Sequence, residues 1–117
     1  MSTAEHWQGV CSVDDVPLRG ARVLARPAGG DIAIFRTAAG GVFALLDRCP
    51  HKGGPLSQGI VHGETVACPL HNWQIGLGDG RAQAPDTGCA ARFAVRVVDG
   101  QVCLRAADLG GDGAAAA

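Results

Sequence analysis

Two stretches of sequence decide the fold and the chemistry of this chain: Cys49-Pro50-His51 and, sixteen residues later, Cys68-Pro69-Leu70-His71. Each stretch offers one thiolate and one imidazole. A proline between the two potential ligands fixes one backbone φ angle in each stretch, and the glycines Gly53-Gly54 let the chain turn close to a metal. We therefore expect two tight loops that face each other and hold one metal centre.

Two cysteines and two histidines suit either a structural zinc ion or a [2Fe–2S] cluster in which two histidines replace two cysteines on one iron. Zinc fingers usually place two cysteines in one loop and two histidines in another. Here each loop is mixed, which fits a cluster whose two irons each draw one kind of ligand from both loops. The spacing favours the cluster over zinc.

This pattern, C-x-H followed after the spacer by C-x-x-H, resembles that of the Rieske family. The resemblance implies that Cys49, His51, Cys68 and His71 bind one [2Fe–2S] cluster per chain, with the two histidines at the exposed tip. It also implies a β-sandwich into which a small cluster-binding subdomain is inserted at about residues 47–88.

The resemblance also bears on the reduction potential. Gly54 and Leu70 stand where high-potential members of the Rieske family carry two cysteines that link the loops by a disulfide. Ile75, which cannot donate a hydrogen bond, stands where those proteins place a tyrosine. Fewer donors stabilise the added electron less, so we expect a low potential, about −150 mV.

The rest of the chain predicts an all-β fold, a sandwich or a small barrel. No apolar stripe of helical period exceeds about two turns, whereas short runs of β-branched and apolar residues alternate with glycine-rich turns. Asp99-Gly100 predicts a type I′ hairpin turn. We expect strands or strand pairs over residues 7–13, 21–26, 31–37, 41–47, 60–67, 74–81 and 92–105.

A length of 117 residues suits one domain with its own core. We assign residues 1–106 to a single Rieske domain and expect residues 107–117, rich in glycine and alanine, to form a disordered tail. A formal net charge of −1 without a basic run argues against a nucleic-acid partner. Because we find neither a long apolar run nor a signal peptide, we expect no membrane contact and a cytoplasmic location.

The remaining cysteines are predicted to be structural. An odd count of five cysteines without an export signal argues against a secreted disulfide framework. We expect Cys11, Cys89 and Cys103 to be buried apolar residues. His62 is expected in an exposed turn, and Pro85-Asp86 resembles the proline-containing third loop that covers a Rieske cluster.

No nucleophile–base pair, phosphate loop or second metal set accompanies the motif, so we expect no catalytic residue and an electron carrier. The run from Cys49 to Gly59, followed by Cys68 to Trp73, resembles the small subunit of assimilatory NAD(P)H-dependent nitrite reductase. That resemblance implies a large partner subunit with flavin, siroheme and a [4Fe–4S] cluster, in a complex that reduces nitrite to ammonium. Two alternatives stay open: a stand-alone Rieske ferredoxin of an aromatic-ring dioxygenase system, and a zinc-stabilised interaction module without a redox role.

Overall fold

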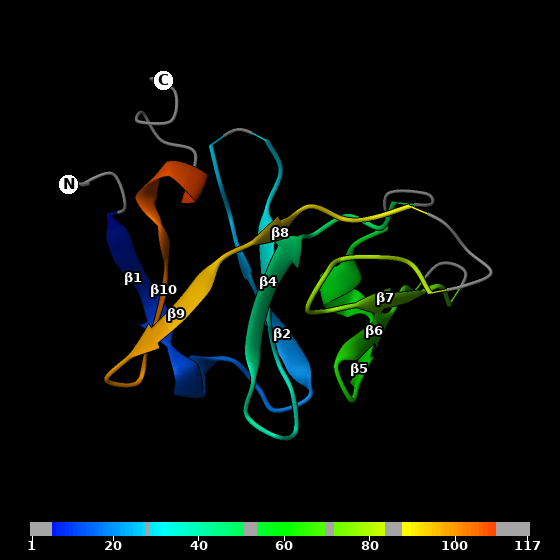
Figure 1. Ribbon diagram of the computed structural model, residues 1–117, viewed down its shortest axis with the longest axis horizontal. Coiled ribbons are helices and arrows are strands. Elements are labelled where there is room, and N and C mark those ends of the chain that lie inside the picture. Colours follow the sequence, from blue (N-terminus) through cyan, green and yellow to red (C-terminus); the bar gives the residue numbers. More distant parts are fainter. Residues whose placement is uncertain (1–5, 28, 51–53, 70–71, 84–87, 110–117) are drawn as a thin grey trace.

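A computed structural model describes residues 6–27, 29–50, 54–69, 72–83 and 88–109 of the chain. These residues form ten β-strands and three short 3-10 helices, and they contain no α-helix. The strands make three small antiparallel sheets, which follow one another along the longest axis of the molecule (Figure 1). The prediction of an all-β fold is confirmed.

The first sheet joins the two ends of the described chain. Its strand order is β1-β10-β9, with β1 at Trp7–Ser12, β9 at Val95–Val98 and β10 at Gln101–Arg105. The backbone φ angles of Asp99 and Gly100 are 51° and 78°, and a type I′ turn requires positive values at both positions. The predicted hairpin is confirmed.

The second sheet has the strand order β2-β3-β4-β8 and the third has β5-β6-β7. Their bounds are β2 Gly20–Leu24, β3 Ile32–Arg36, β4 Val42–Leu46, β8 Arg92–Phe93, β5 Ile60–His62, β6 Thr65–Ala67 and β7 Gln74–Gly76. The 3-10 helices are η1 (Val13–Asp15), η2 (Leu56–Gln58) and η3 (Ala106–Leu109). The third sheet comes from the part of the sequence between β4 and β8. The exact bounds 47–88 of the inserted subdomain stay a prediction.

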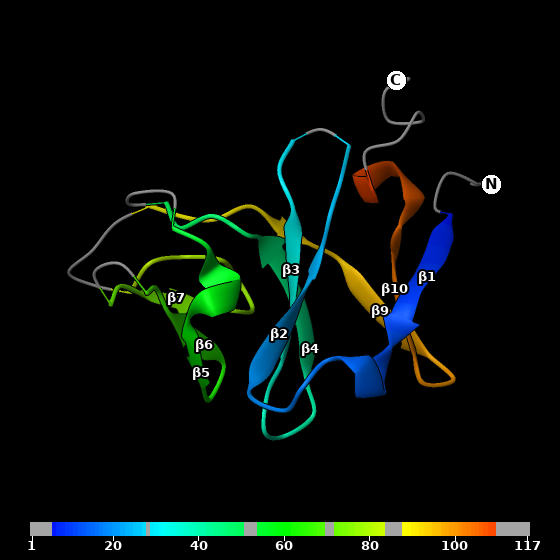
Figure 2. The same cartoon turned by 180° about the vertical axis from the view of Figure 1, so that it is seen from behind.

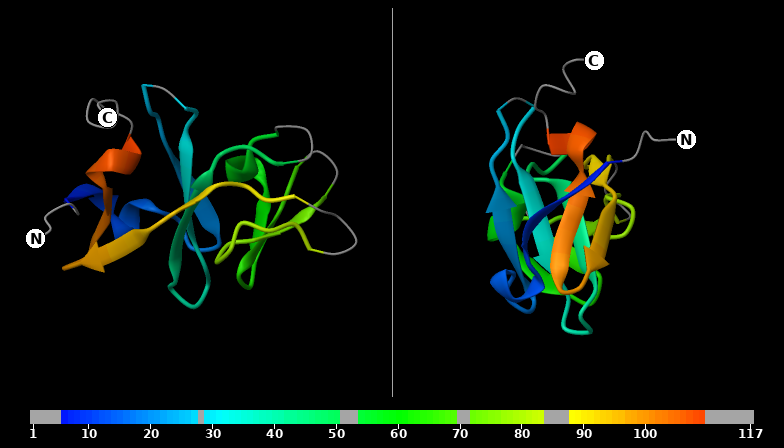
Figure 3. Two further views of the ribbon diagram at one scale, coloured as in Figure 1. Left: turned by 45° about the horizontal axis from the view of Figure 1, so that its top comes forward. Right: turned by 90° about the vertical axis from the view of Figure 1, so that its left-hand side faces the viewer.

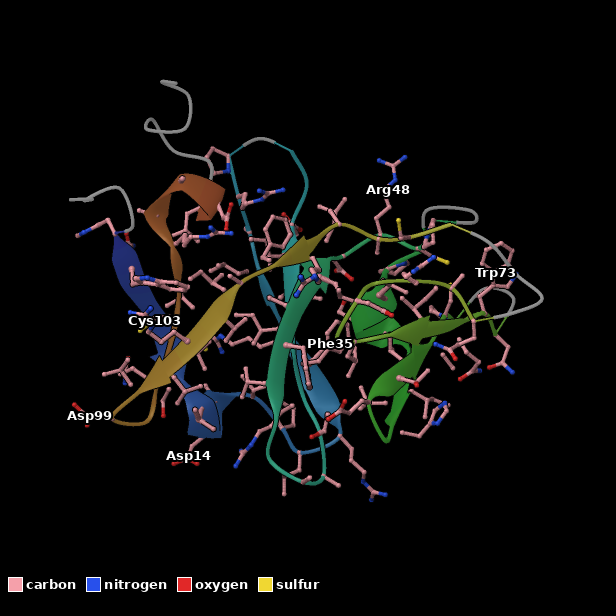
Figure 4. All side chains as sticks on the ribbon, in the orientation of Figure 1. Asp14, Phe35, Arg48, Trp73, Asp99 and Cys103 are labelled. Atoms are coloured by element: carbon pink, nitrogen blue, oxygen red, sulfur yellow. The ribbon has the colours of Figure 1, made fainter. Side chains whose placement is uncertain are left out.

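The second sheet lies between the other two, and its strand β3 is buried on both faces (Figures 2 and 3). Successive side chains of a strand point to opposite faces, so β3 divides its residues between two cores. Ile32 and Ile34 pack in the core shared with the first sheet, and Ala33 and Phe35 pack in the core shared with the third. Figure 4 shows Phe35 on the side of the second sheet that faces β5–β7.

Three expectations need correction. The strand predicted over 74–81 ends at Gly76, and the pair predicted over 92–105 is interrupted at Ala94, which separates β8 from β9. Residues 107–109, which we expected at the start of a disordered tail, belong to η3. Leu109 packs against the core that the first and second sheets share. Residues 110–117 of that predicted tail lie outside the described residues.

The three cysteines predicted to be buried fall into two groups. Cys11 and Cys103 are buried, as predicted, and burial raises the pKa of the Cys11 thiol. Cys89 is exposed, so that prediction is wrong. The chain is extended at this point, and its neighbour Ala90 takes the inward position in the core instead.

None of the helices found in the described parts of the chain is long and apolar enough to cross a membrane.

Candidate metal centre

The first loop, residues 48–55, begins directly after β4. Cys49 is only 2% exposed, and its backbone N–H donates a hydrogen bond of 2.7 Å to the carbonyl oxygen of Gly54. This bond joins the two described ends of the loop. The Cys49 side chain is thereby held at the inner side of the loop, in the core between the second and third sheets.

The second loop, residues 68–73, connects β6 to β7. The backbone N–H of Cys68 donates to the carbonyl oxygen of Trp73 (2.7 Å), and the N–H of Asn72 donates to the carbonyl oxygen of Cys68 (2.9 Å). Asn72 has a φ angle of 58°, in the left-handed region that asparagine adopts more readily than most residues. These bonds close the loop tightly, and Cys68 is 3% exposed.

The structure places Cys49 and Cys68 in one core, together with Phe35 and Ile75. No disulfide joins any of the five cysteines, all of which lie among the described residues. Two thiols held at the base of neighbouring closed loops, away from water, suit the thiolate side of an iron–sulfur cluster. The cysteine half of the predicted ligand set therefore fits such a cluster.

The histidine half of the set, His51 and His71, lies outside the described residues, so both stay predictions. The same holds for the predicted third loop at Pro85-Asp86. Within the described ranges alone, no group of three or more histidine, cysteine, aspartate or glutamate side chains is arranged to hold a metal ion.

A third segment of chain lies against the first loop at Gly88. This residue has a φ angle of 119°, and a Cβ atom added to it would lie 3.2 Å from the Cβ of Pro50. The segment is held from both sides, because Ala82 N–H donates to the carbonyl oxygen of Gly88 (2.9 Å) and Ala90 N–H donates to that of Gly80 (2.7 Å). The backbone thus passes directly beside the proline that separates the two potential ligands of the first loop.

Trp73 and His62 lie near the second loop. The half-buried side chain of Trp73 packs against the core that contains both cysteines, and Figure 4 shows it at the end of the molecule where the loops lie. His62 is exposed, as predicted, but it is the last residue of β5 and not a turn residue. Its Nε2 lies 2.5 Å from Oε1 of Gln74, whose Nε2 donates to the carbonyl oxygen of Asn72 (3.1 Å). A surface histidine is thus tied to the second loop through Gln74.

A side-chain pair at the base of the first loop was not predicted from the sequence. Asp47 accepts two hydrogen bonds from Ser57, one from the backbone N–H to Oδ1 (2.7 Å) and one from Oγ to Oδ2 (2.8 Å). Neither residue belongs to a recognisable ligand pattern. Their only sequence signal is a carboxylate at the end of a predicted strand and a serine after a proline-containing loop.

Comparison with known proteins adds a family match. Residues 6–98 match the Rieske [2Fe–2S] domain. The first curated relatives are much longer proteins, and the chain spans only 14% to 21% of their length.

Three similar proteins are matched over most of their length. The 3-phenylpropionate/cinnamic acid dioxygenase ferredoxin subunit of Photorhabdus laumondii is 36% identical, over 81% of this chain and 90% of that protein. A chain in the solved complex of reduced oxygenase and oxidized ferredoxin in carbazole 1,9a-dioxygenase superposes with a TM-score of 0.76 at 27% identity, covering 85% of this chain and 92% of that one. A solved structure described as a putative nitrite reductase NADPH small subunit superposes with a TM-score of 0.72 at 29% identity, covering 85% and 97%.

Proposed function

Because the chain belongs to the Rieske [2Fe–2S] domain family, we propose that Cys49, His51, Cys68 and His71 hold the Rieske-type cluster that this domain implies. The cysteine positions are supported by their shared core and by the closed loops that carry them. The histidine positions are supported by the spacing of the motif.

When bound, the cluster supplies the transfer of one electron at a time. The protein's part is to keep two thiolates buried, to fix their loops by backbone hydrogen bonds, and to keep water away with the surrounding core. The chain alone is an electron carrier, and any catalytic step belongs to its partner.

The first test is metal analysis with EPR spectroscopy. We expect about two irons per purified chain and, after reduction with dithionite, a signal with an average g value near 1.9, since two imidazoles on one iron distinguish this cluster from one with four thiolates. The measurement needs anaerobic purification and separate quantification of iron and zinc. One zinc per chain with a silent spectrum would instead establish the zinc-stabilised interaction module.

For the redox partner, we propose that the chain is a Rieske ferredoxin that delivers electrons to the oxygenase component of a multicomponent oxygenase. The observation that carries this proposal is the 36% identity to a dioxygenase ferredoxin subunit over nearly the whole of that protein. The comparisons favour a dioxygenase ferredoxin over the nitrite reductase small subunit, which the sequence of the two loops resembles.

The nitrite reductase small subunit is the second candidate. It is favoured by the run Cys68 to Trp73 with its Asn72-Trp73 pair, and by the structural likeness at 29% identity. In that case the partner would be a large subunit with flavin, siroheme and a [4Fe–4S] cluster. A cytoplasmic location stays a prediction under either candidate.

Electron delivery separates the two candidates. The chain is isolated from its native host under mild conditions, and NAD(P)H-dependent turnover is measured with and without it. We expect an oxygenase whose substrate-dependent oxygen uptake is lost when the chain is omitted or replaced by a Cys49→Ser variant. A co-purifying protein that contains siroheme, with nitrite-dependent NAD(P)H oxidation and no oxygen uptake, would establish the second candidate instead.

A further inference from the structure

We propose that Asp47 is a positioning residue for the cluster: it holds the base of the first ligand loop and, as a fixed negative charge, lowers the midpoint potential of the cluster. This inference rests on the proposal that Cys49 is a ligand. It concerns a residue outside the ligand set, and its test reads a potential rather than the activity of a complex.

The carboxylate of Asp47 has the geometry of an anchor. Both oxygens of Asp47 accept hydrogen bonds from the same residue, Ser57, at 2.7 Å from its backbone N–H and 2.8 Å from its Oγ, in a partly buried position. The backbone N–H of Asp47 in turn donates to the carbonyl oxygen of Asp31 at 2.9 Å. The first loop lies in the sequence between the second sheet and η2. Asp47 therefore anchors η2 to the second sheet across the base of this loop.

This anchor is linked to Cys49 through the core. Leu56, the neighbour of Ser57, is fully buried and packs in the same core as Cys49. The chain between Asp47 and Ser57 is thus closed at its base by side-chain hydrogen bonds and further along by the bond from Cys49 N–H to the carbonyl oxygen of Gly54. Loss of the Asp47–Ser57 hydrogen bonds would loosen the segment that carries the Cys49 side chain.

The negative charge of Asp47 lies close to the first ligand position along the chain. Two residues of extended chain span at most about 7 Å, so the Cα of Asp47 lies within about that distance of the Cα of Cys49. The screening length is about 8 Å at physiological ionic strength, so a carboxylate this close along the chain to a ligand is screened only in part, and partial burial weakens screening further. Reduction adds one electron to the cluster, and a nearby negative charge opposes it. The side chain of Arg48 has the opposite charge but is exposed to solvent, as Figure 4 shows, so its effect is screened more strongly.

The test separates charge from hydrogen bonding. In Asp47→Asn, the amide oxygen can still accept from the Ser57 N–H, and the amide nitrogen can donate to Ser57 Oγ, so the closure is kept while the charge is removed. We expect this variant to hold its cluster and to melt near the wild-type temperature, but to have a higher midpoint potential. Asp47→Ala removes both the charge and the hydrogen bonds to Ser57. We expect it to raise the midpoint potential, lower the melting temperature and lose iron faster.

Asp99→Asn is the matched control. It removes the same charge from the β9–β10 turn, at the opposite end of the molecule from Trp73 (Figure 4), and asparagine is well suited to the positive φ angle of 51° there. We expect no change in its midpoint potential. A wild-type midpoint in Asp47→Asn, or an equal rise in Asp99→Asn, would overturn the inference.

Ser57→Ala supplies a second variant with the opposite sign. It keeps the charge of Asp47 but removes the Oγ donor that partly neutralises it, so we expect a lower midpoint potential together with a lower melting temperature. An unchanged or raised midpoint in Ser57→Ala would contradict the role of charge even if Asp47→Asn held no cluster. A wild-type chain that binds no cluster would refute the proposed function instead, and the two failures are therefore distinguishable.

Discussion

Replacement of Cys49 by serine is expected to remove the cluster altogether. A serine hydroxyl is a harder and far less acidic ligand than a thiol, and iron–sulfur clusters are held by thiolates. Cys49 is 2% exposed, so water has little access to take the place of the lost ligand. We expect the iron content to fall from about two atoms per chain to near zero, with loss of the EPR signal of the reduced protein.

Cys103→Ser provides the control for this result. Cys103 is also buried and lies in the first sheet, away from the loops (Figure 4), so the same chemical change is made outside the proposed ligand set. We expect Cys103→Ser to keep its iron and its spectrum, at some cost in stability. Full iron content in Cys49→Ser, or an equal loss in both variants, would remove Cys49 from the ligand set.

A large loss of stability is expected from Gly80→Ala. The φ angle of Gly80 is 73°, and an added Cβ would lie 2.3 Å from the carbonyl oxygen of Ala90, a backbone atom that cannot turn away like a side chain. The same approach brings the N–H of Ala90 to the carbonyl oxygen of Gly80 at 2.7 Å, so relieving the clash would break that bond. The backbone strain and the overlap together are expected to lower the free energy of unfolding by about 3 kcal/mol or more.

The unfolding measurement should use urea, with the midpoint compared at an unchanged slope. Gly63→Ala is the matched control, because Gly63 also has a positive φ angle, 58°, but no atom within 4 Å of an added Cβ. We expect it to cost about 1 kcal/mol from the backbone conformation alone. Similar losses in the two variants would mean that the close approach at Ala90 contributes little.

The parts of the fold that were predictable from sequence are those set by local chemistry. The hairpin of β9 and β10 follows from Asp99-Gly100, which suits two successive positive φ angles. The pairing of β3 with β4 follows from two β-branched and apolar runs on either side of a glycine-rich connection. The tight loops at Cys49 and Cys68 follow from proline and glycine next to the ligand positions.

The structural features that could not be predicted from the sequence depend on contacts between distant segments. Nothing local indicates that Ser57 donates to Asp47, because the pairing exists only when η2 packs beside the end of β4. The exposure of Cys89 depends on which of the two neighbours after Gly88, Cys89 or Ala90, turns its side chain into the core. Periodicity alone could not decide this, since both residues are small and apolar enough for a core.

The position of β3 has a consequence for how the molecule unfolds. Ile34 and Phe35 are adjacent in the sequence yet belong to different cores, so removing β3 from the second sheet would open both cores at once. The backbone amides of β3 should therefore exchange with solvent only through global unfolding. We therefore expect a ligand that stabilises the loops at one end to slow exchange in β3 as well.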